Sequence, residues 1–276
     1  METETPAAQI FDPAPKGYIE YEIDVEKILR DDLPGIIATS EEASLTLEAV
    51  NAMPERAKGA YVLYEDGHPV YAGKTDTRHG FRSRLGRHFQ TVQSRIDLDP
   101  ARLSFKAVRI MVFSNFDVEA ILIKELRRQD PTALAWNFSG FGSNDPGHNR
   151  EGQEPADFDK ERPVDIDRPL PFIAPGKMPL LKLLIGLKDG LTYDFRYQTD
   201  PNEKGKPSHY RVGEVDQREA GDIELPDRPL TMREALKIVL AALPKGWCAT
   251  VFPNRVILYR ESVTYQYARE YIRAEK

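Results

Sequence analysis

The sequence predicts an α/β protein of the α+β kind, in which a small sandwich with a central three-stranded antiparallel sheet precedes a smaller α+β C-terminal domain. Three observations predict this fold class. A hairpin pattern occupies residues 59–73, and helix, strand and helix patterns follow it in the order β-β-α-β-α. A Pro-rich segment then separates these elements from a second set of apolar runs.

The hairpin pattern consists of two short apolar runs around a turn. Residues 61–64 and 70–71 have the aromatic and β-branched character of strands. Asp66-Gly67 lies between them and is typical of a tight turn, because glycine accepts a positive φ. We therefore expect Tyr61 and Tyr71 to lie on paired or neighbouring strands, close enough for both phenols to reach one site.

Two amphipathic helices and a strand follow the hairpin. Residues 81–95 carry apolar side chains at helical spacing, and Arg84 and His88, four residues apart, lie on an adjoining face. Residues 103–113 are rich in β-branched side chains and predict the third strand. Residues 117–128 predict the second helix, with Asn115 or Asp117 as cap and Glu119 in its first turn.

We divide the chain into an acidic N-terminal extension (1–55), a compact unit (56–140), a Pro-rich loop or linker (141–179) and a C-terminal domain (180–276). In the extension we expect disorder over residues 1–16, an extended segment at 18–23 and a helix from Glu41 to Met53 with Ser40 as N-cap. In the C-terminal domain we expect a strand at 181–187, a meander at 191–212, a helix from the Thr231 capping box to Leu243, a hairpin over 247–259 and a last helix from Ser262 to Ala274.

Five short motifs occur in sequence within the compact unit: Gly59-Ala60-Tyr61, Tyr71-Ala72-Gly73, Arg84-Leu85-Gly86-Arg87-His88, Glu119-Ala120-Ile121-Leu122-Ile123 and Trp136-Asn137. This series resembles the GIY-YIG nuclease module, which implies a small α/β sandwich over less than a third of the chain. The tail at residues 140–147 is similar to the branch of that family that contains type II restriction endonucleases. An insertion at residues 128–135 departs from the family pattern.

The resemblance implies a role for each motif residue in phosphodiester hydrolysis. It makes Tyr61 the general base, Tyr71 a hydrogen-bond partner of the nucleophile or phosphate, Arg84 the phosphate ligand, Glu119 the metal ligand, and Asn137 the residue that orients the phosphate or braces the site. A phenol is a poor base at neutral pH unless its neighbours lower its pKa, and Lys74, His88 and a nearby metal could do so for Tyr61. Taken singly, each of these residues also has a purely structural explanation. A tyrosine on a strand, for example, commonly packs in the core. Their order along the chain favours a nuclease.

The implied cofactor is Mg²⁺ or Mn²⁺, because a hard cation suits a carboxylate, waters and a phosphate as ligands. Glu125 is a rival to Glu119, since it lies 12 residues before Asn137, a spacing common in the family. The Glu-Ala-x-Leu-Ile context favours Glu119.

The charge is distributed unevenly along the chain. The net charge is −6, yet residues 56–113 hold 11 basic against 5 acidic side chains, whereas residues 1–55 hold 3 against 13. A basic surface around the motifs would attract a polyanion. We therefore expect DNA as partner, with contacts from Arg78, Arg82, Arg87, His148 and Arg150.

Several other classes of protein are excluded or disfavoured. The single cysteine, Cys248, excludes an internal disulfide framework and a zinc site built from cysteines. No apolar run approaches the roughly 20 residues of a membrane helix, and the start of the chain lacks a signal-peptide pattern. We therefore expect a cytoplasmic protein with no membrane attachment.

The sequence as a whole predicts a hydrolase, namely a Mg²⁺-dependent endodeoxyribonuclease of a restriction or phage-defence system. Two alternatives stay open: a catalytically silent nucleic-acid-binding or docking protein on the same fold, and a nuclease of DNA repair or of a mobile element. We expect residues 1–175 to hold the catalytic groups, and the C-terminal domain to set where they act or to dock a protein partner. A homodimer is left open.

Overall fold

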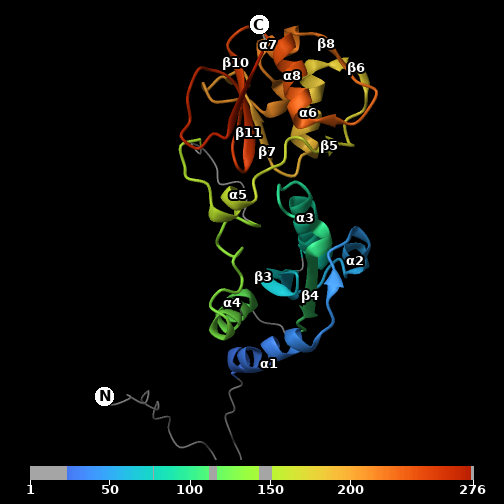
Figure 1. Ribbon diagram of the computed structural model, residues 1–276, viewed down its shortest axis with the longest axis vertical. Helices are drawn as coiled ribbons and strands as arrows, with labels where there is room; N and C mark the ends of the chain where they lie inside the picture. The colour runs from blue at the N-terminus through green and yellow to red at the C-terminus, as the bar shows by residue number, and fades with distance from the viewer. Residues whose placement is uncertain (1–23, 77, 112–116, 143–150, 275–276) are drawn as a thin grey trace, which may run out of the picture.

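The computed structural model describes residues 24–76, 78–111, 117–142 and 151–274, and its mixture of helices and antiparallel sheet confirms the α+β class (Figure 1). The N-terminal half contains α1 (Val25–Thr39), β1 (Ala43–Ser44), α2 (Leu47–Ala52), β2 (Gly59–Glu65), β3 (His68–Thr75), α3 (Phe81–Gln93), a 3-10 turn (Pro100–Arg102), β4 (Leu103–Arg109) and α4 (Val118–Gln129). The segments expected at residues 1–16 and 18–23, and Asn115, lie outside the described residues.

The first sheet is antiparallel, with strand order β1-β4-β2-β3. β2 pairs with β3 across a turn at Asp66 and Gly67, both with positive φ, so the predicted hairpin is confirmed. The sheet has four strands and not three, because residues 43–44 pair with β4. The helix expected from Glu41 therefore begins only at Leu47, where the Thr46 side chain accepts a hydrogen bond from the backbone N–H of Ala49.

Helices cover both faces of this sheet. Successive β2 side chains alternate between faces, so Tyr61 and Leu63 join the core beneath α2 and α3, whereas Ala60 and Val62 join the core that includes α1 and α4. Helices α3 and α4 lie where the sequence predicted them. Helix α1 was not predicted, and it packs along α4. The sheet is therefore the middle layer of three.

The C-terminal half has its own sheet and core. After α5 (Asp157–Glu161), β5 (Pro169–Leu170) and β6 (Gly176–Pro179) come α6 (Leu180–Gly190), β7 (Asp194–Tyr197), a 3-10 turn (Tyr210–Val212), α7 (Val215–Glu219), β8 (Asp222–Leu225), β9 (Leu230–Thr231), α8 (Met232–Ala242), β10 (Trp247–Val251), β11 (Arg255–Arg260) and β12 (Glu270–Arg273). The sheet order is β12-β10-β11-β7, and β7 runs parallel to β11. Helices α6 and α8 share one apolar core with it.

Two predictions for this half are confirmed and two are wrong. The Thr231 capping box starts α8, and β10 and β11 form the expected hairpin. The strand expected at 181–187 is α6, whose four buried leucines recur at helical spacing: Leu180, Leu183, Leu184 and Leu187. The helix expected from Ser262 is instead a loop followed by β12, because pairing with β10 provides the backbone partners.

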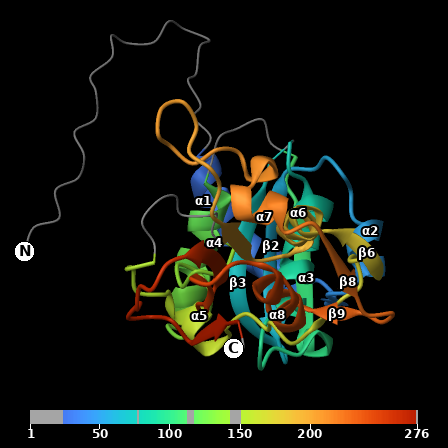
Figure 2. The ribbon, with the colours of Figure 1, turned by 90° about the horizontal axis from the view of Figure 1, so that it is seen from above.

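The segment at residues 141–179 joins the two halves by packing into both. Phe141 and Phe158 belong to the core beneath α3, whereas Val164 belongs to the C-terminal core together with Ile166 and Leu170. Figure 1 shows α5 between the two halves, and Figure 2 shows the C-terminal elements stacked over α3 and β3. None of the helices formed by the described residues combines the length and apolar character needed to cross a bilayer.

Candidate active site

Side chains from β2, β3 and α3 meet where α3 packs on the first sheet. The hydroxyl of Tyr61 on β2 lies 2.8 Å from Nε2 of His88 on α3. The ring of Tyr71 on β3 lies 5.0 Å from the His88 ring and 6.2 Å from the Tyr61 ring, measured between centroids. Tyr61 and His88 are buried and Tyr71 is partly exposed. The structure therefore brings both tyrosines and the histidine of the motifs into one cluster.

Two residues that the sequence analysis did not nominate complete this cluster. The ring of Phe141 stacks on His88, with centroids 4.8 Å apart and an angle of 16° between the planes. Gly142 follows with φ +72°, and a Cβ atom there would lie 3.1 Å from the Tyr71 hydroxyl. In the sequence, the glycines on either side of Phe141, soon after Asn137, were the signal that could have pointed to a contribution from this segment. Close backbone approach explains why residue 142 is a glycine.

Burial controls the protonation of the cluster. It is the largest influence on Tyr61 and raises the pKa of that phenol well above its usual 10.0, Tyr71 adding to the rise and Arg84 opposing it. Burial lowers the pKa of His88 to about 3, and the positive charges of Arg84 and Arg87 contribute to the decrease. His88 is neutral and therefore contributes no positive charge that would lower the Tyr61 pKa.

Arg84 and Glu119 supply opposite charges to this cluster. The Nε of Arg84 is buried and has no hydrogen-bond partner within the part of the chain that the structure describes. Burial raises the pKa of Glu119, with Lys74 and Arg84 opposing and Asp117 adding to the rise. Both Arg84 and Glu119 influence the pKa values of Tyr61 and Tyr71, so both charges lie near the phenols.

Glu125 lies elsewhere. It is buried on α4, its Oε2 accepts a hydrogen bond of 2.8 Å from Arg128, and it lines a hollow with Arg30 and Pro34 of α1. A ligand at Glu125 would therefore bind against α1, away from the tyrosines. The geometry favours Glu119 as the candidate metal ligand.

Asn137 and Lys74 make structural contacts next to the cluster. Asn137 is buried, and its side-chain amide makes two hydrogen bonds of 2.8 Å, from the backbone N–H of Ala72 and to the carbonyl of the same residue. It therefore braces β3 beside Tyr71, one of the two roles expected for it. The Lys74 ammonium lies 2.9 Å from Asp117, the N-cap of α4, and so holds the start of the helix that carries Glu119.

The candidate nucleic-acid contacts are distributed over and around α3. Arg87 is exposed near His88, Arg78 is exposed before the helix, and Arg82 pairs with Glu55 at 2.6 Å. His148 and Arg150 lie outside the described residues. Of these described candidates, Arg87 is the one whose positive charge lowers the pKa of His88.

The residues present fit a magnesium ion held by one carboxylate. Within the described ranges, no group of three or more His, Cys, Asp and Glu side chains is placed to hold a metal, which disfavours a closed all-protein site. Mg²⁺ is often held by one or two carboxylates, with waters and substrate phosphate as its other ligands. Glu119 is half-buried with a raised pKa, so a nearby cation would offset the cost of its burial.

Sequence comparisons find no matching family model and no match among curated proteins. The candidate site is therefore supported by its own geometry and by the motif resemblance.

Proposed function

We propose that this protein is a metal-dependent endonuclease that hydrolyses phosphodiester bonds in DNA. One observation carries the proposal: Tyr61, Tyr71 and His88, from β2, β3 and α3, meet in one cluster, and the charges of Arg84 on α3 and Glu119 on α4 act on both phenols. Hydrolysis needs a group to take a proton from water and positive charge at the phosphate. The cluster contains candidates for both tasks next to a carboxylate.

Each side chain has a role that follows from its surroundings. The partly buried Arg84 has an unused Nε donor, which suits a phosphate oxygen. Tyr71 is partly exposed, unlike the buried Tyr61, and in the proposed reaction it hydrogen-bonds the attacking water or the phosphate. Glu119 would hold Mg²⁺ or Mn²⁺, which supplies charge neutralisation at the phosphate.

The raised pKa of Tyr61 means that its phenolate needs a compensating positive charge. Arg84 already opposes the rise, and a cation held by Glu119 would act in the same direction. The Tyr61 hydroxyl lies 2.8 Å from Nε2 of the neutral His88 ring, which holds it in place. In the proposed reaction the Tyr61 phenolate accepts a proton from the attacking water and becomes the neutral phenol.

The test is a cleavage assay on supercoiled and linear DNA, with the purified protein in Mg²⁺, in Mn²⁺ and in EDTA. We expect nicked or linear products with metal and none with EDTA. A protein that leaves DNA intact over a range of metal and salt concentrations would contradict the proposal. Restriction or phage defence is the proposed biological setting, in the cytoplasm, and repair or a mobile element is the alternative setting.

A second candidate function is DNA binding without catalysis. The observation that favours it is the burial of Tyr61, which opposes the loss of its proton. Under this alternative the protein would shift DNA in a gel equally with Mg²⁺ and with EDTA, and would produce no new ends. The cleavage assay therefore separates the two functions.

A further inference from the structure

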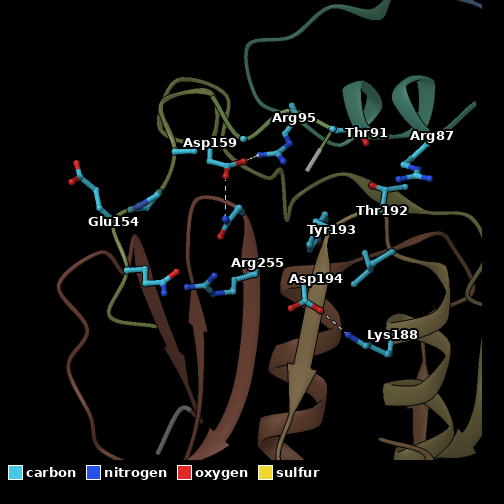
Figure 3. A pocket seen from close by; sticks show the side chains of 17 residues that line it. Arg87, Thr91, Arg95, Glu154, Asp159, Lys188, Thr192, Tyr193, Asp194 and Arg255 are labelled. Carbon is cyan, nitrogen blue, oxygen red and sulfur yellow. Dashed lines mark hydrogen bonds and ion pairs between the residues drawn. The ribbon is translucent and has the colours of Figure 1, made fainter. Parts of the chain in front are cut away.

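A cleft of about 500 Å³ lies between the two halves of the protein. One wall consists of Arg87 and Thr91 of α3 and of Arg95, which follows the helix, and the opposite wall includes Thr192 and Tyr193 from the loop before β7 (Figure 3). Gly140 and Gly142, residues 153–156 and Asp159 also line the cleft. Both halves of the chain are therefore needed to form it.

The cleft adjoins the tyrosine cluster. Gly142 lines it, and a Cβ atom on Gly142 would lie 3.1 Å from the Tyr71 hydroxyl and 3.2 Å from Cε1 of His88. Arg87 also lines it, and its charge influences the pKa values of Tyr71 and His88. A strand bound at the cluster would therefore enter the cleft with the neighbouring nucleotide.

The polar groups of the cleft suit a ligand rich in acceptor oxygens. Its three carboxylates are already paired: Asp159 with Arg95 at 2.8 Å, Asp194 with Lys188 at 2.7 Å and Glu154 with Lys160 at 2.6 Å. Arg87 has no ion-pair partner among the residues that the structure describes. The Arg95 Nε and the Tyr193 hydroxyl are buried donors without a hydrogen-bond partner in the same described part of the chain. Such groups in a native protein call for an explanation, and a bound ligand provides one.

We propose that this cleft binds one nucleotide of the DNA strand, the one next to the scissile phosphate and held outside the base stack. Its phosphate lies between Arg87 and Thr192, and its base enters toward Tyr193 and Arg95. The size supports this, because pockets of about 300–1,000 Å³ enclose single small ligands, whereas a duplex needs an extended interface of about 1,000–2,500 Å². This inference rests on the proposed function and adds that the C-terminal half contacts the substrate.

The test uses the full chain with Thr192→Glu, which places a negative charge in the cleft at an exposed loop position. The matched control is Thr264→Glu, at an exposed loop position of the same half that does not line the cleft. Binding of a fluorescent single-stranded oligonucleotide is measured in EDTA by anisotropy. We expect Thr192→Glu to weaken this binding about tenfold, because the new carboxylate and the phosphate would repel each other at close range. We expect Thr264→Glu to leave the binding unchanged. Arg87→Ala removes the positive charge proposed to face the phosphate, and it should also weaken oligonucleotide binding.

Cleavage kinetics in Mg²⁺ provide the second readout. We expect Thr192→Glu to raise KM by about tenfold with little change in kcat, and cleavage to be faster where bases next to the cut are unpaired. A protein that cuts DNA with the same KM in wild type and Thr192→Glu would overturn the cleft assignment and leave the nuclease proposal standing. If the wild-type protein cuts no DNA and Thr192→Glu still weakens oligonucleotide binding, the nuclease proposal is overturned and the assignment of the cleft as a nucleotide site stands.

Free deoxynucleoside monophosphates distinguish the source of the nucleotide. If they compete with the oligonucleotide only at much higher concentration, the cleft acts as one subsite along a strand. If a free mononucleotide binds more tightly than the oligonucleotide, the cleft is a site for a free nucleotide and the strand assignment is wrong.

Discussion

The Tyr61 hydroxyl lies 2.8 Å from Nε2 of His88, and this contact joins β2 to α3 through two buried polar groups. Burial disfavours the charged form of each, so both are neutral near pH 7. A histidine that is neutral in the folded protein and charges readily in the unfolded chain makes stability depend on pH.

The first prediction is that the protein loses stability as the pH falls below about 6.5. The pKa of His88 is about 3 in the folded protein against an ordinary 6.5. Between these values the unfolded chain binds the proton and the folded protein does not, so lower pH favours unfolding. Each pH unit in this window removes up to about 1.4 kcal/mol. Denaturant unfolding of wild type and His88→Gln at pH 7 and pH 5 measures the effect.

His88→Gln retains a hydrogen-bonding side chain next to Tyr61 but cannot titrate. We expect wild type to lose about 2 kcal/mol more than the variant between pH 7 and pH 5. Equal losses in both proteins would show that His88 takes up its proton at an ordinary pH and that its environment is less apolar than described.

The second prediction concerns Arg84. Arg84→Ala should reduce the cleavage rate by about 10²-fold or more, because a donor aimed at developing phosphate charge is lost. The free energy of unfolding should change by about 0.5 kcal/mol or less, since Arg84 is only partly buried and makes no ion pair among the described residues. Arg102→Ala is the control, because Arg102 pairs with Asp66 at the hairpin turn. A variant at Arg84 that still cuts at the wild-type rate would remove Arg84 from the site.

The third prediction separates the two candidate metal ligands. Glu119→Gln should abolish Mg²⁺-dependent cleavage, and the fold should tolerate the amide because burial already disfavours the charged carboxylate. Glu125→Gln should retain activity, since Glu125 is paired with Arg128 beside α1. Calorimetric titration of Mg²⁺ or Mn²⁺ in the presence of DNA provides the direct measurement. Loss of metal binding in Glu125→Gln alone would transfer the ligand to that residue.

Sequence reasoning predicted well those elements whose signals are local. Asp66-Gly67 fixed the hairpin because the turn needs positive φ, and the Thr231 capping box marked the start of α8. It failed where tertiary pairing decided the outcome. Residues 270–273 pair with β10 as a strand, and residues 43–44 become a sheet edge on β4. Neither partner is visible from local pattern.

The same division holds for the candidate site. Tyr61, Tyr71 and His88 do meet, as their motif order indicated. Lys74 instead pairs with Asp117. Phe141 packs on His88, and although the tail at residues 140–147 had been noted, it carried no expectation of this contact. The cleft requires Thr192 and Tyr193 from more than 100 residues after Arg87 in the chain, and such proximity follows only from the packing of both halves.

The fourth prediction concerns Gly142. Gly142→Ala should reduce cleavage about tenfold, because its Cβ would lie 3.1 Å from the Tyr71 hydroxyl and displace that ring. Gly67→Ala is the matched control: its φ of +78° is close to the +72° of Gly142, but no atom lies within 4 Å of the added Cβ. Both variants should lose about 1–2 kcal/mol of stability from backbone strain. If both lose activity equally, strain and not the contact with Tyr71 explains the effect.

The last prediction concerns Asp159, which holds the two halves together. One carboxylate oxygen lies 2.8 Å from the buried guanidinium of Arg95, which follows α3, and the other accepts a hydrogen bond of 3.0 Å from Asn254 in the β10–β11 turn. Next to it, the backbone N–H of Val164 donates to Pro253 and that of Asp165 donates to Ser94. Asp159→Asn would leave Arg95 buried without its counter-charge.

Breaking a buried ion pair by removing one partner costs about 3–5 kcal/mol. We therefore expect Asp159→Asn to lower the free energy of unfolding by about that amount, and to speed hydrogen exchange at Val164 and Asp165 before exchange rises in β2. Asp157→Asn, two residues away and highly exposed, should change neither quantity. Because Val164 packs in the C-terminal core, a chain cut near Gly176 would expose it. Residues 1–175, which are expected to hold the catalytic groups, would lose this contact if they were isolated. Fast exchange at Val164 in the wild-type protein would show that the halves separate readily and that Asp159 does not hold them.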